Sequence, residues 1–381
     1  MTSAQAAASA VPGPLRFAQR LIAWQRAYGR HDLPWQASRE PYRVWLSEIM
    51  LQQTQVRVVQ AYYDRFLQRF PTVGDLAAAS IDDVLAQWSG LGYYRRARYL
   101  HLCAQQVWTR HAGEFPRTQR ELQLLAGIGR STAAAIAAFC FGERSAILDG
   151  NVKRVLGRAF ALPARATQAA QQRALWELAE TLLPEEHLAA YTQGLMDLGS
   201  TVCKPRNPQC AACPFAIDCQ ARLAQHRAAA LSDAGASIKP HARPAGTPVR
   251  KAQHWVLLWA EDVQAPEPRV WLERRNTQGI WPGLWSLPQF HSVTEALRRA
   301  ALLGMVREQI ELACATHALT HLDLQLQPLL VRLDRVSAAQ EHAGQWYTLG
   351  AALDLGLPAP IRRLLQSRSR SQAPVQHADL S

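Results

Sequence analysis

The chain has 381 residues, of which 48% are hydrophobic and 19% charged. This length allows two or more domains with separate cores, because single cores rarely grow beyond about 300 residues. Its 42 basic and 30 acidic side chains give a formal net charge of +12. Such an excess is typical of a protein that binds a polyanion, and nucleic acid is the first candidate. A basic protein without such a partner is the alternative.

Residues 1–14 contain neither the basic segment nor the Leu- or Val-rich run of a signal peptide, so we expect a disordered tail there. The most apolar helical run, 131–141, is shorter than the roughly 18 residues of a membrane span. We therefore expect a cytoplasmic protein. Clustered cysteines in that reducing compartment are more often metal ligands than disulfides.

Apolar residues recur at three- and four-residue spacing from residue 15 to residue 223, which predicts a helical domain. Examples are Val44, Trp45, Ile49 and Met50, and Leu175, Leu178 and Leu182.

Glu48 is the one acidic residue in the apolar stretch 44–56. Apolar surroundings raise the pKa of a carboxyl group and allow it to donate a proton near neutral pH. A glutamate on a solvated helix face is the alternative interpretation.

A Gly-x-Gly turn, Gly127 to Gly129, lies between two helical patterns, 119–125 and 132–141. Two glycines allow a chain reversal with positive φ and bring backbone N–H groups close to a phosphate. The turn could also be an ordinary corner between helices, but Arg130 and the net charge favour phosphate binding.

Asp149 and Asn151 precede another helical pattern, where either residue could act as an N-cap. Asp149 could also supply a second carboxylate to Glu48. Cleavage of a bond between a sugar carbon and nitrogen needs an acid for the leaving group and a negative charge beside the developing oxocarbenium ion.

Four of the seven cysteines lie within seventeen residues, with the spacing C-x6-C-x2-C-x5-C: Cys203, Cys210, Cys213 and Cys219. Zinc sites usually pair two short C-x2-4-C hooks, whereas this single compact loop suits one iron–sulfur cluster. We expect an iron–sulfur site over a zinc site here. The other three, Cys103, Cys140 and Cys314, are expected to be buried or surface thiols.

The composition changes after residue 223. Residues 224–251 are rich in Ala, Pro, Gly and charge and predict a linker. The runs 254–259 and 269–273 are of β type, 281–287 is a turn-rich aromatic stretch, and 293–311 is predicted to be helical, which together indicate an α+β domain over 252–365. We expect residues 366–381 to be a disordered tail.

The motifs SEIMLQQTQV, LAGIGRSTAAAI, LDGNVKRVL and the four-cysteine loop, in this order, resemble the endonuclease III branch of the helix-hairpin-helix DNA glycosylases. The segments 33–36, 90–98 and 193–199, together with the appended α+β domain, are similar to the adenine-removing members of that branch. The resemblance extends from residue 15 to about residue 365. It implies a mainly α helix-hairpin-helix glycosylase domain with a [4Fe-4S] loop at 203–219, followed by an α+β Nudix-like domain that recognises 8-oxoguanine.

The resemblance also implies the reaction, which is hydrolysis of adenine from double-stranded DNA where it is mispaired with 8-oxoguanine or guanine, after the base flips out. Glu48 would protonate adenine N7 and later assist water, Asp149 would stabilise the oxocarbenium ion, and Asn151 would help to hold the sugar and the carboxylates. Trp35 and Gln36 would line the adenine pocket. The enzyme would act as a monomer on the bacterial nucleoid.

The DNA contacts implied by the resemblance come from separate segments. Gln53, Leu91 and Tyr93 would intercalate around the oxidised guanine, and Gly127, Gly129 and Ser131 would lie at the hairpin that binds a phosphate. Bifunctional relatives carry lysine where this chain has Ser131, and a serine cannot form a Schiff base. Base removal without strand cleavage is therefore expected, with Lys153 as a phosphate contact.

In the Nudix-like domain, the helix that should carry clustered glutamates reads TEALRRAAL, so we expect no Mg²⁺ site there. The loop Leu319-Thr320-His321 corresponds to the family's Phe-Ser-His, and Thr320 and His321 would contact 8-oxoguanine. Two other functions remain open: a bifunctional glycosylase and lyase similar to endonuclease III, and a non-catalytic DNA-binding iron–sulfur protein.

Overall fold

The computed structural model describes residues 13–162, 167–232, 251–276, 278–319, 322–336 and 344–372. These residues form two compact units, and each unit contains segments from separate parts of the chain. Among the described residues, one unit contains those from 13–63, 72–77 and 102–232, and the other contains those from 64–71, 78–101 and 251–372. The expected tail 1–14 falls almost wholly outside the described residues.

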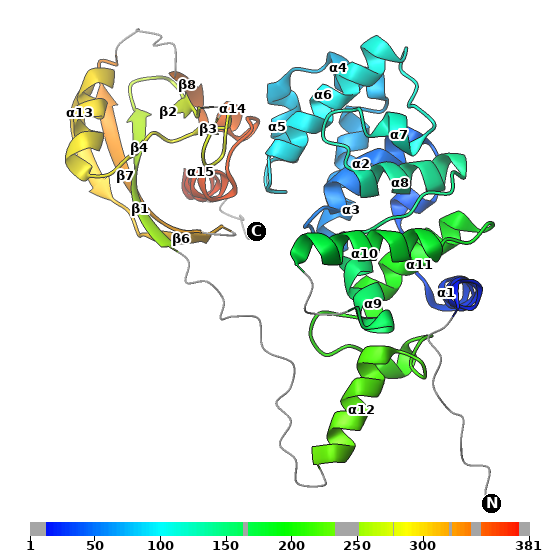
Figure 1. Cartoon of the computed structure of the whole chain (residues 1–381). Coiled ribbons are helices and arrows are strands. Elements are labelled where there is room, and N and C mark those ends of the chain that lie inside the picture. The colour runs from blue at the N-terminus through cyan, green and yellow to red at the C-terminus, as the bar shows by residue number, and fades with distance from the viewer. Residues whose placement is uncertain are drawn as a thin grey trace, which may run out of the picture. The chain divides into compact units, whose positions relative to one another are not determined.

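The first unit is built from helices, as the apolar spacing predicts (Figure 1). The helices that lie in it wholly or in part are α1 (Pro14–Tyr28), η1 (Pro34–Gln36), α2 (Pro41–Leu51), α3 (Val56–Arg69), α4 (Val73–Ala78), α6 (Arg95–Arg110), α7 (Gln119–Leu122), α8 (Arg130–Ile136), η2 (Ala137–Phe141), α9 (Gly150–Phe160), α10 (Gln168–Thr181), α11 (Leu188–Asp197), η3 (Leu198–Val202), η4 (Cys210–Ala212) and α12 (Gln220–Ser232).

The main core of this unit lies between α1, α9, α10 and α11 and extends to the cysteine loop. The Phe17 ring of α1 stacks on the Phe215 ring of that loop, with centroids 4.2 Å apart. Arg20, one turn later, pairs with Asp218 and donates to the Pro214 carbonyl. The start of the helical domain and the cysteine loop therefore pack together although about 200 residues separate them.

The second unit contains α5 (Ile81–Trp88), the first turns of α6 and an eight-stranded sheet. The strands are β1 (Lys251–Asp262), β2 (Arg269–Arg274), β3 (Trp285–Ser286), β4 (Gln289–Phe290), β5 (Met305–Glu311), β6 (Ala315–Ala318), β7 (Leu322–Asp334) and β8 (Gly344–Thr348). Strands β1 and β7 are parallel over twelve residues, and the other pairings are antiparallel.

Helix α13 (Val293–Leu303) packs on β1 and β7, while α14 (Leu349–Leu353) and α15 (Ala359–Gln372) lie on the other side of the sheet (Figure 1). The buried residues Val256, Leu258, Leu329 and Val331 form the core under α13. The two predicted β-type runs, 254–259 and 269–273, are thus confirmed as strands, and the α+β class is confirmed.

Three expectations about secondary structure are corrected. Residues 305–311 form strand β5 and not the end of a helix, because α13 stops at Gly304 and pairing with β7 decides the conformation of the next seven residues. Helix α12 continues to Ser232, inside the expected linker, and α15 continues to Gln372, inside the expected tail. The extension of α12, 224–232, is rich in Ala, which favours helix without needing an apolar face, and the extension of α15, 366–372, consists of Gln, Arg and Ser.

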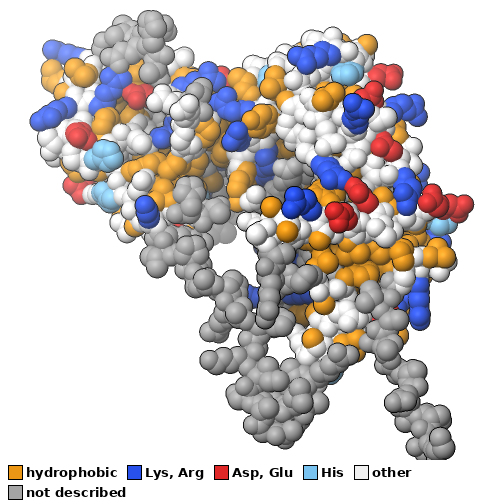
Figure 2. Space-filling view, viewed as in Figure 1, with side chains coloured by type: hydrophobic (Ala, Val, Ile, Leu, Met, Phe, Trp, Pro, Cys, Tyr) orange, Lys and Arg blue, Asp and Glu red, His pale blue; other side chains and the backbone are white. Residues whose placement is uncertain are grey.

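No helix among the described residues is long and apolar enough to cross a membrane. Lys and Arg side chains are more widespread on the visible face than Asp and Glu side chains, in keeping with the positive net charge (Figure 2).

Candidate active site

Glu48 lies on α2, which begins with Pro41 after a Glu40 N-cap whose carboxylate accepts from the Tyr42 N–H at 3.1 Å. Most of this helix is buried; Trp45, Leu46 and Met50 have no exposed surface. Packing of these neighbours fixes the rotation of α2 and directs Glu48 into a cavity of about 280 Å³. The predicted apolar environment of Glu48 is therefore present.

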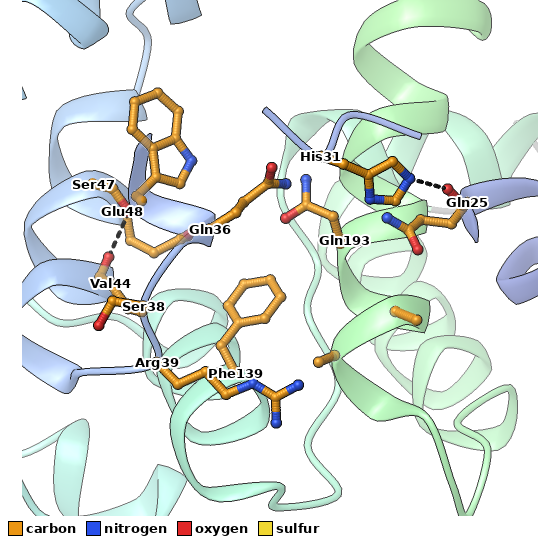
Figure 3. Close-up of a pocket in the computed structure, with 13 residues that line it drawn as sticks. Gln25, His31, Gln36, Ser38, Arg39, Val44, Ser47, Glu48, Phe139 and Gln193 are labelled. Atoms are coloured by element: carbon orange, nitrogen blue, oxygen red, sulfur yellow. Dashed lines mark hydrogen bonds between the residues drawn. The ribbon is translucent and has the colours of Figure 1, made fainter. Parts of the chain in front are cut away.

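The cavity lies between α2 and α11 (Figure 3). Its lining comes from five separate parts of the chain: Gln25, His31, Trp35, Gln36, Ser38, Arg39, Val44, Ser47, Glu48, Phe139, Ala189, Ala190 and Gln193. Trp35 and Gln36, which sequence reasoning assigned to the base pocket, are among them. His31, Arg39 and Phe139 were missed, because no local motif marks them and only folding brings them to Glu48.

Hydrogen bonds hold the polar lining in place. Gln36 accepts from the Leu33 N–H at 3.2 Å and donates to the Arg30 carbonyl at 3.0 Å. Gln193 donates to the Asp197 carboxylate at 2.8 Å, and that fully buried carboxylate also pairs with Arg30. The two glutamine side chains are thus oriented before any base enters the cavity.

Burial, with a smaller contribution from the nearby Asp149 carboxylate, raises the pKa of Glu48 from 4.5 to about 8. Glu48 keeps part of its surface open to the cavity. A carboxyl group with this pKa carries its proton at neutral pH and can act as a general acid toward a bound base.

Asp149 is the N-cap of α9, and its carboxylate accepts from the Val152 N–H at 2.8 Å. The capping role and the charge beside Glu48 thus belong to the same residue, although Asp149 does not line the cavity itself. Asn151 donates to Asp149 at 3.5 Å and accepts from Arg154 at 2.7 Å. A Cβ at Gly199 would lie 2.5 Å from the Asn151 Cβ, so only glycine allows η3 to approach this helix start so closely.

Helix α9 is also tied to the cysteine loop. Arg154 donates to the Cys203 carbonyl at 2.7 Å and to the Gly199 carbonyl at 2.6 Å. Arg158, one turn later, donates to the Lys204 carbonyl at 2.7 Å and to the Cys203 Sγ at 3.4 Å. The loop therefore braces the helix that begins at Asp149.

The four cysteines of the loop line one cavity of about 250 Å³ and form no disulfide. Among the described residues, no three His, Cys, Asp or Glu side chains close on a single-ion site. Of the other cysteines, Cys103 is buried, Cys140 is partly buried and Cys314 is exposed, and all three are free thiols as expected.

The hairpin before α8 differs in detail from the expectation. Gly127 has φ of 75° and needs the left-handed region, whereas Gly129 is extended with φ of −85° and serves as the N-cap of α8. Arg130 pairs with Glu180, and its guanidinium carbon lies 3.9 Å from the centre of the Trp176 ring. These partners on α10 hold the exposed Arg130 side chain against the surface of the protein, where its role in phosphate binding stays a prediction.

The Ser131 hydroxyl accepts from the Leu148 N–H at 2.9 Å. Leu148 is buried and directly precedes Asp149. Ser131, expected from sequence at the DNA surface, is therefore joined to the segment that carries the second carboxyl group.

The residues expected to enter DNA differ in exposure. Gln53 is exposed and has φ of 58°, and Tyr93 is 46% exposed with φ of 49°. Leu91 is 6% exposed, so it would have to leave its packing to enter a duplex. Tyr94 is buried, which makes Tyr93 the accessible member of the tyrosine pair. Thr320 and His321 lie outside the described residues.

Comparison with known proteins agrees with this geometry. The family described as HhH-GPD superfamily base excision DNA repair protein matches residues 46–181, and the NUDIX domain matches residues 258–367. An adenine DNA glycosylase of Buchnera aphidicola (subsp. Baizongia pistaciae) is 34% identical over 92% of this chain and 96% of its own length. The chain belongs to the adenine DNA glycosylases.

Among other adenine DNA glycosylases, the human one is 35% identical over 80% of this chain and 63% of its own length. A solved thermostable thymine-DNA glycosylase superposes on 55% of the chain with a TM-score of 0.51 and 29% identity, covering 97% of that structure. Members of the adenine DNA glycosylase family cleave the N-glycosidic bond of adenine in DNA, so the alternative of a non-catalytic binding protein is set aside.

Substitution of Glu48 by Gln should reduce adenine release at least about 1000-fold, because the proton donor is lost. In the unsubstituted enzyme, the single-turnover rate should fall as pH rises through about 8, where Glu48 loses its proton. Glu40→Gln, at the N-cap of the same helix and outside the cavity, should change the rate less than about 3-fold. A Glu48→Gln variant that retains a tenth of the rate would contradict the assignment.

The same pKa has a consequence for stability. The folded state binds a proton at Glu48 between pH 4.5 and about 8 while the unfolded state does not, so the free energy of unfolding should fall as pH rises through this window. Thermal melts of Glu48→Gln should lack this decline. Between low pH and pH 8 the parent should lose about 4 kcal/mol of stability through this group, and the variant should not.

Ser131→Ala should lower the adenine-release rate about 10-fold with little change in DNA affinity. The substitution leaves the Leu148 N–H, next to Asp149, without its acceptor, and a buried N–H without an acceptor costs about 1–3 kcal/mol. Ser131→Thr keeps the hydroxyl and should restore most of the rate. Ser145→Ala is the matched control, because the hydroxyl of Ser145 donates to Glu143 in the same segment. Equal rates for the Ala and Thr variants at position 131 would disprove the role of the hydrogen bond.

Proposed function

We propose that the enzyme hydrolyses adenine mispaired with 8-oxoguanine, or with guanine, in double-stranded DNA. The observation that carries this proposal is the position of Glu48 in a cavity lined by Trp35 and Gln36, where burial and the nearby Asp149 raise its pKa to about 8. Glu48 donates its proton to N7 of the flipped adenine, which makes the base a neutral leaving group. Asp149 supplies negative charge beside the oxocarbenium ion, and Asn151 helps to hold the carboxylate and the sugar.

The proposed contacts to the orphaned partner base come from exposed side chains. Tyr93 and Gln53 enter the duplex, each from a backbone in the left-handed region, a strained conformation that is common at functional sites. Leu91 joins them if its turn opens. Thr320 and His321 of the Nudix-like domain contact 8-oxoguanine, while Gly127 and Gly129 offer backbone N–H groups to a phosphate.

The cysteine loop suits a [4Fe-4S] cluster. Its four free thiols line one cavity, and the Arg158 guanidinium donates to one sulfur. Cys203, Cys210, Cys213 and Cys219 would hold the cluster as thiolates. A bound cluster would stiffen the loop that braces α9 and would keep Lys204 and Arg206 available to phosphates. We further propose that the enzyme acts as a monomer in the cytoplasm, on the bacterial nucleoid.

The reaction class is tested with a duplex containing adenine opposite 8-oxoguanine. The enzyme should release free adenine and leave a site that breaks only on heating with alkali, because Ser131 cannot form a Schiff base. The same duplex with adenine opposite thymine is the control and should stay intact. Borohydride trapping of a protein–DNA adduct in high yield would favour the remaining alternative, a glycosylase and lyase.

The cluster is tested by metal content and colour. The purified enzyme should be brown and contain iron and sulfide in equal amounts, and Cys213→Ser should lose both. Cys314→Ser changes an exposed cysteine outside the loop and should retain them. A colourless, zinc-loaded and fully active enzyme would show that the site is not an iron–sulfur centre.

A further inference from the structure

The turn between α5 and α6 carries Tyr93 in a conformation that the sequence alone does not favour. Gly90, Gly92 and Tyr93 have φ of 99°, 78° and 49°. The left-handed region is strained for a tyrosine, so the surrounding contacts must maintain this turn. Within the turn, Trp88 donates to the Gly92 carbonyl at 3.0 Å and the Arg96 N–H donates to the Tyr93 carbonyl at 2.8 Å.

Both ends of the turn are attached to one carbonyl far along the chain. The Ser89 hydroxyl donates to the Leu357 carbonyl at 2.7 Å, and the Tyr94 hydroxyl donates to the same oxygen at 3.2 Å. The Tyr94 hydroxyl also accepts from the Gly90 N–H at 3.1 Å. All three side chains, of Ser89, Tyr94 and Leu357, are buried. Two hydroxyls on one carbonyl use both of its lone pairs, so the oxygen fixes the distance between the ends of the turn.

Arg362 on α15 completes this arrangement. Its Nε donates to the Ser89 hydroxyl at 3.0 Å, and its two terminal nitrogens donate to the Leu353 carbonyl at 2.6 Å and the Leu355 carbonyl at 2.8 Å. One planar guanidinium thus binds both Ser89 and the chain segment just before Leu357, whose carbonyl accepts from Ser89. At the same place, a Cβ on Gly356 would lie 2.8 Å from the Leu85 Cβ of α5.

We propose that these contacts of Ser89, Tyr94, Leu357 and Arg362, named here the turn clamp, set the position of Tyr93 against the base opposite adenine. The C-terminal segment 353–362 then contributes to opposite-base selectivity through Tyr93. Residues 78–101 and 353–362 belong to one compact unit, as this role requires. The inference rests on the proposed entry of Tyr93 into the duplex.

A double-mutant cycle tests the turn clamp. The measured quantity is the ratio of single-turnover adenine-release rates opposite 8-oxoguanine and opposite guanine. Ser89→Ala and Tyr94→Phe should each lower this ratio about 5-fold, the usual effect of one lost hydrogen bond. In a Tyr93→Ala background, Ser89→Ala should cause no further loss, because the clamp acts through Tyr93.

Ser80→Ala is the matched control, since Ser80 caps the other end of α5 by accepting from the Asp83 N–H at 3.1 Å. Its loss should lower the melting temperature as much as Ser89→Ala does but leave the ratio unchanged. The proposal is overturned if Ser80→Ala and Ser89→Ala lower the ratio alike, or if Ser89→Ala lowers it equally with and without Tyr93.

Failure of the clamp and failure of the proposed function give different results. If the parent enzyme prefers 8-oxoguanine and Tyr93→Ala abolishes the preference, but Ser89→Ala and Tyr94→Phe both retain it within about 2-fold, the clamp alone is wrong. If the parent enzyme shows no preference between the two opposite bases, the proposed reading of 8-oxoguanine is wrong and the clamp proposal falls with it.

Discussion

Burial of the Glu48 carboxyl group close to Asp149 is the constraint on which the helical unit depends. Burial among packed residues removes Glu48 from most of the solvent, and a second carboxylate nearby makes its ionisation still less favourable. The two acids come from α2 and from the start of α9, so their approach must be imposed by packing elsewhere. Gly199 permits the close contact at Asn151, and Arg154 and Arg158 anchor α9 to the cysteine loop. The loop, remote in sequence, thus serves the geometry of the acids.

The boundary between the two compact units does not coincide with the boundary between the two family matches. The family matches cover 46–181 and 258–367, whereas residues 64–71 and 78–101 cluster with the C-terminal residues. The reason is a set of contacts made by α5, its C-cap and the start of α6: Arg274 pairs with Asp82, Ser89 donates to the Leu357 carbonyl, and Arg98 of α6 donates to the Pro282 carbonyl. A helix that the family match places in the glycosylase domain is therefore stabilised by the Nudix-like domain.

The residues predictable from sequence are those whose chemistry is unusual for their neighbourhood. Glu48 in an apolar run, Asp149 before a helix and the four spaced cysteines can each be found locally. His31, Arg39 and Phe139 cannot, because their place in the cavity depends on the tertiary fold alone. Strand β5 is wrongly predicted as helix for a related reason, since its conformation depends on hydrogen bonds to β7, which lies later in the chain.

The side chain at position 131 cannot both accept the hydrogen bond from the Leu148 N–H and carry the amine of a Schiff-base nucleophile. A lysine at position 131 would bring an amine able to form a Schiff base, but an ammonium group has no lone pair to accept the Leu148 N–H. The exchange that opens a route to strand cleavage would thus also loosen the segment that presents Asp149. A lineage moving from hydrolysis toward lyase chemistry on this scaffold would need a second change that provides a new acceptor for that amide.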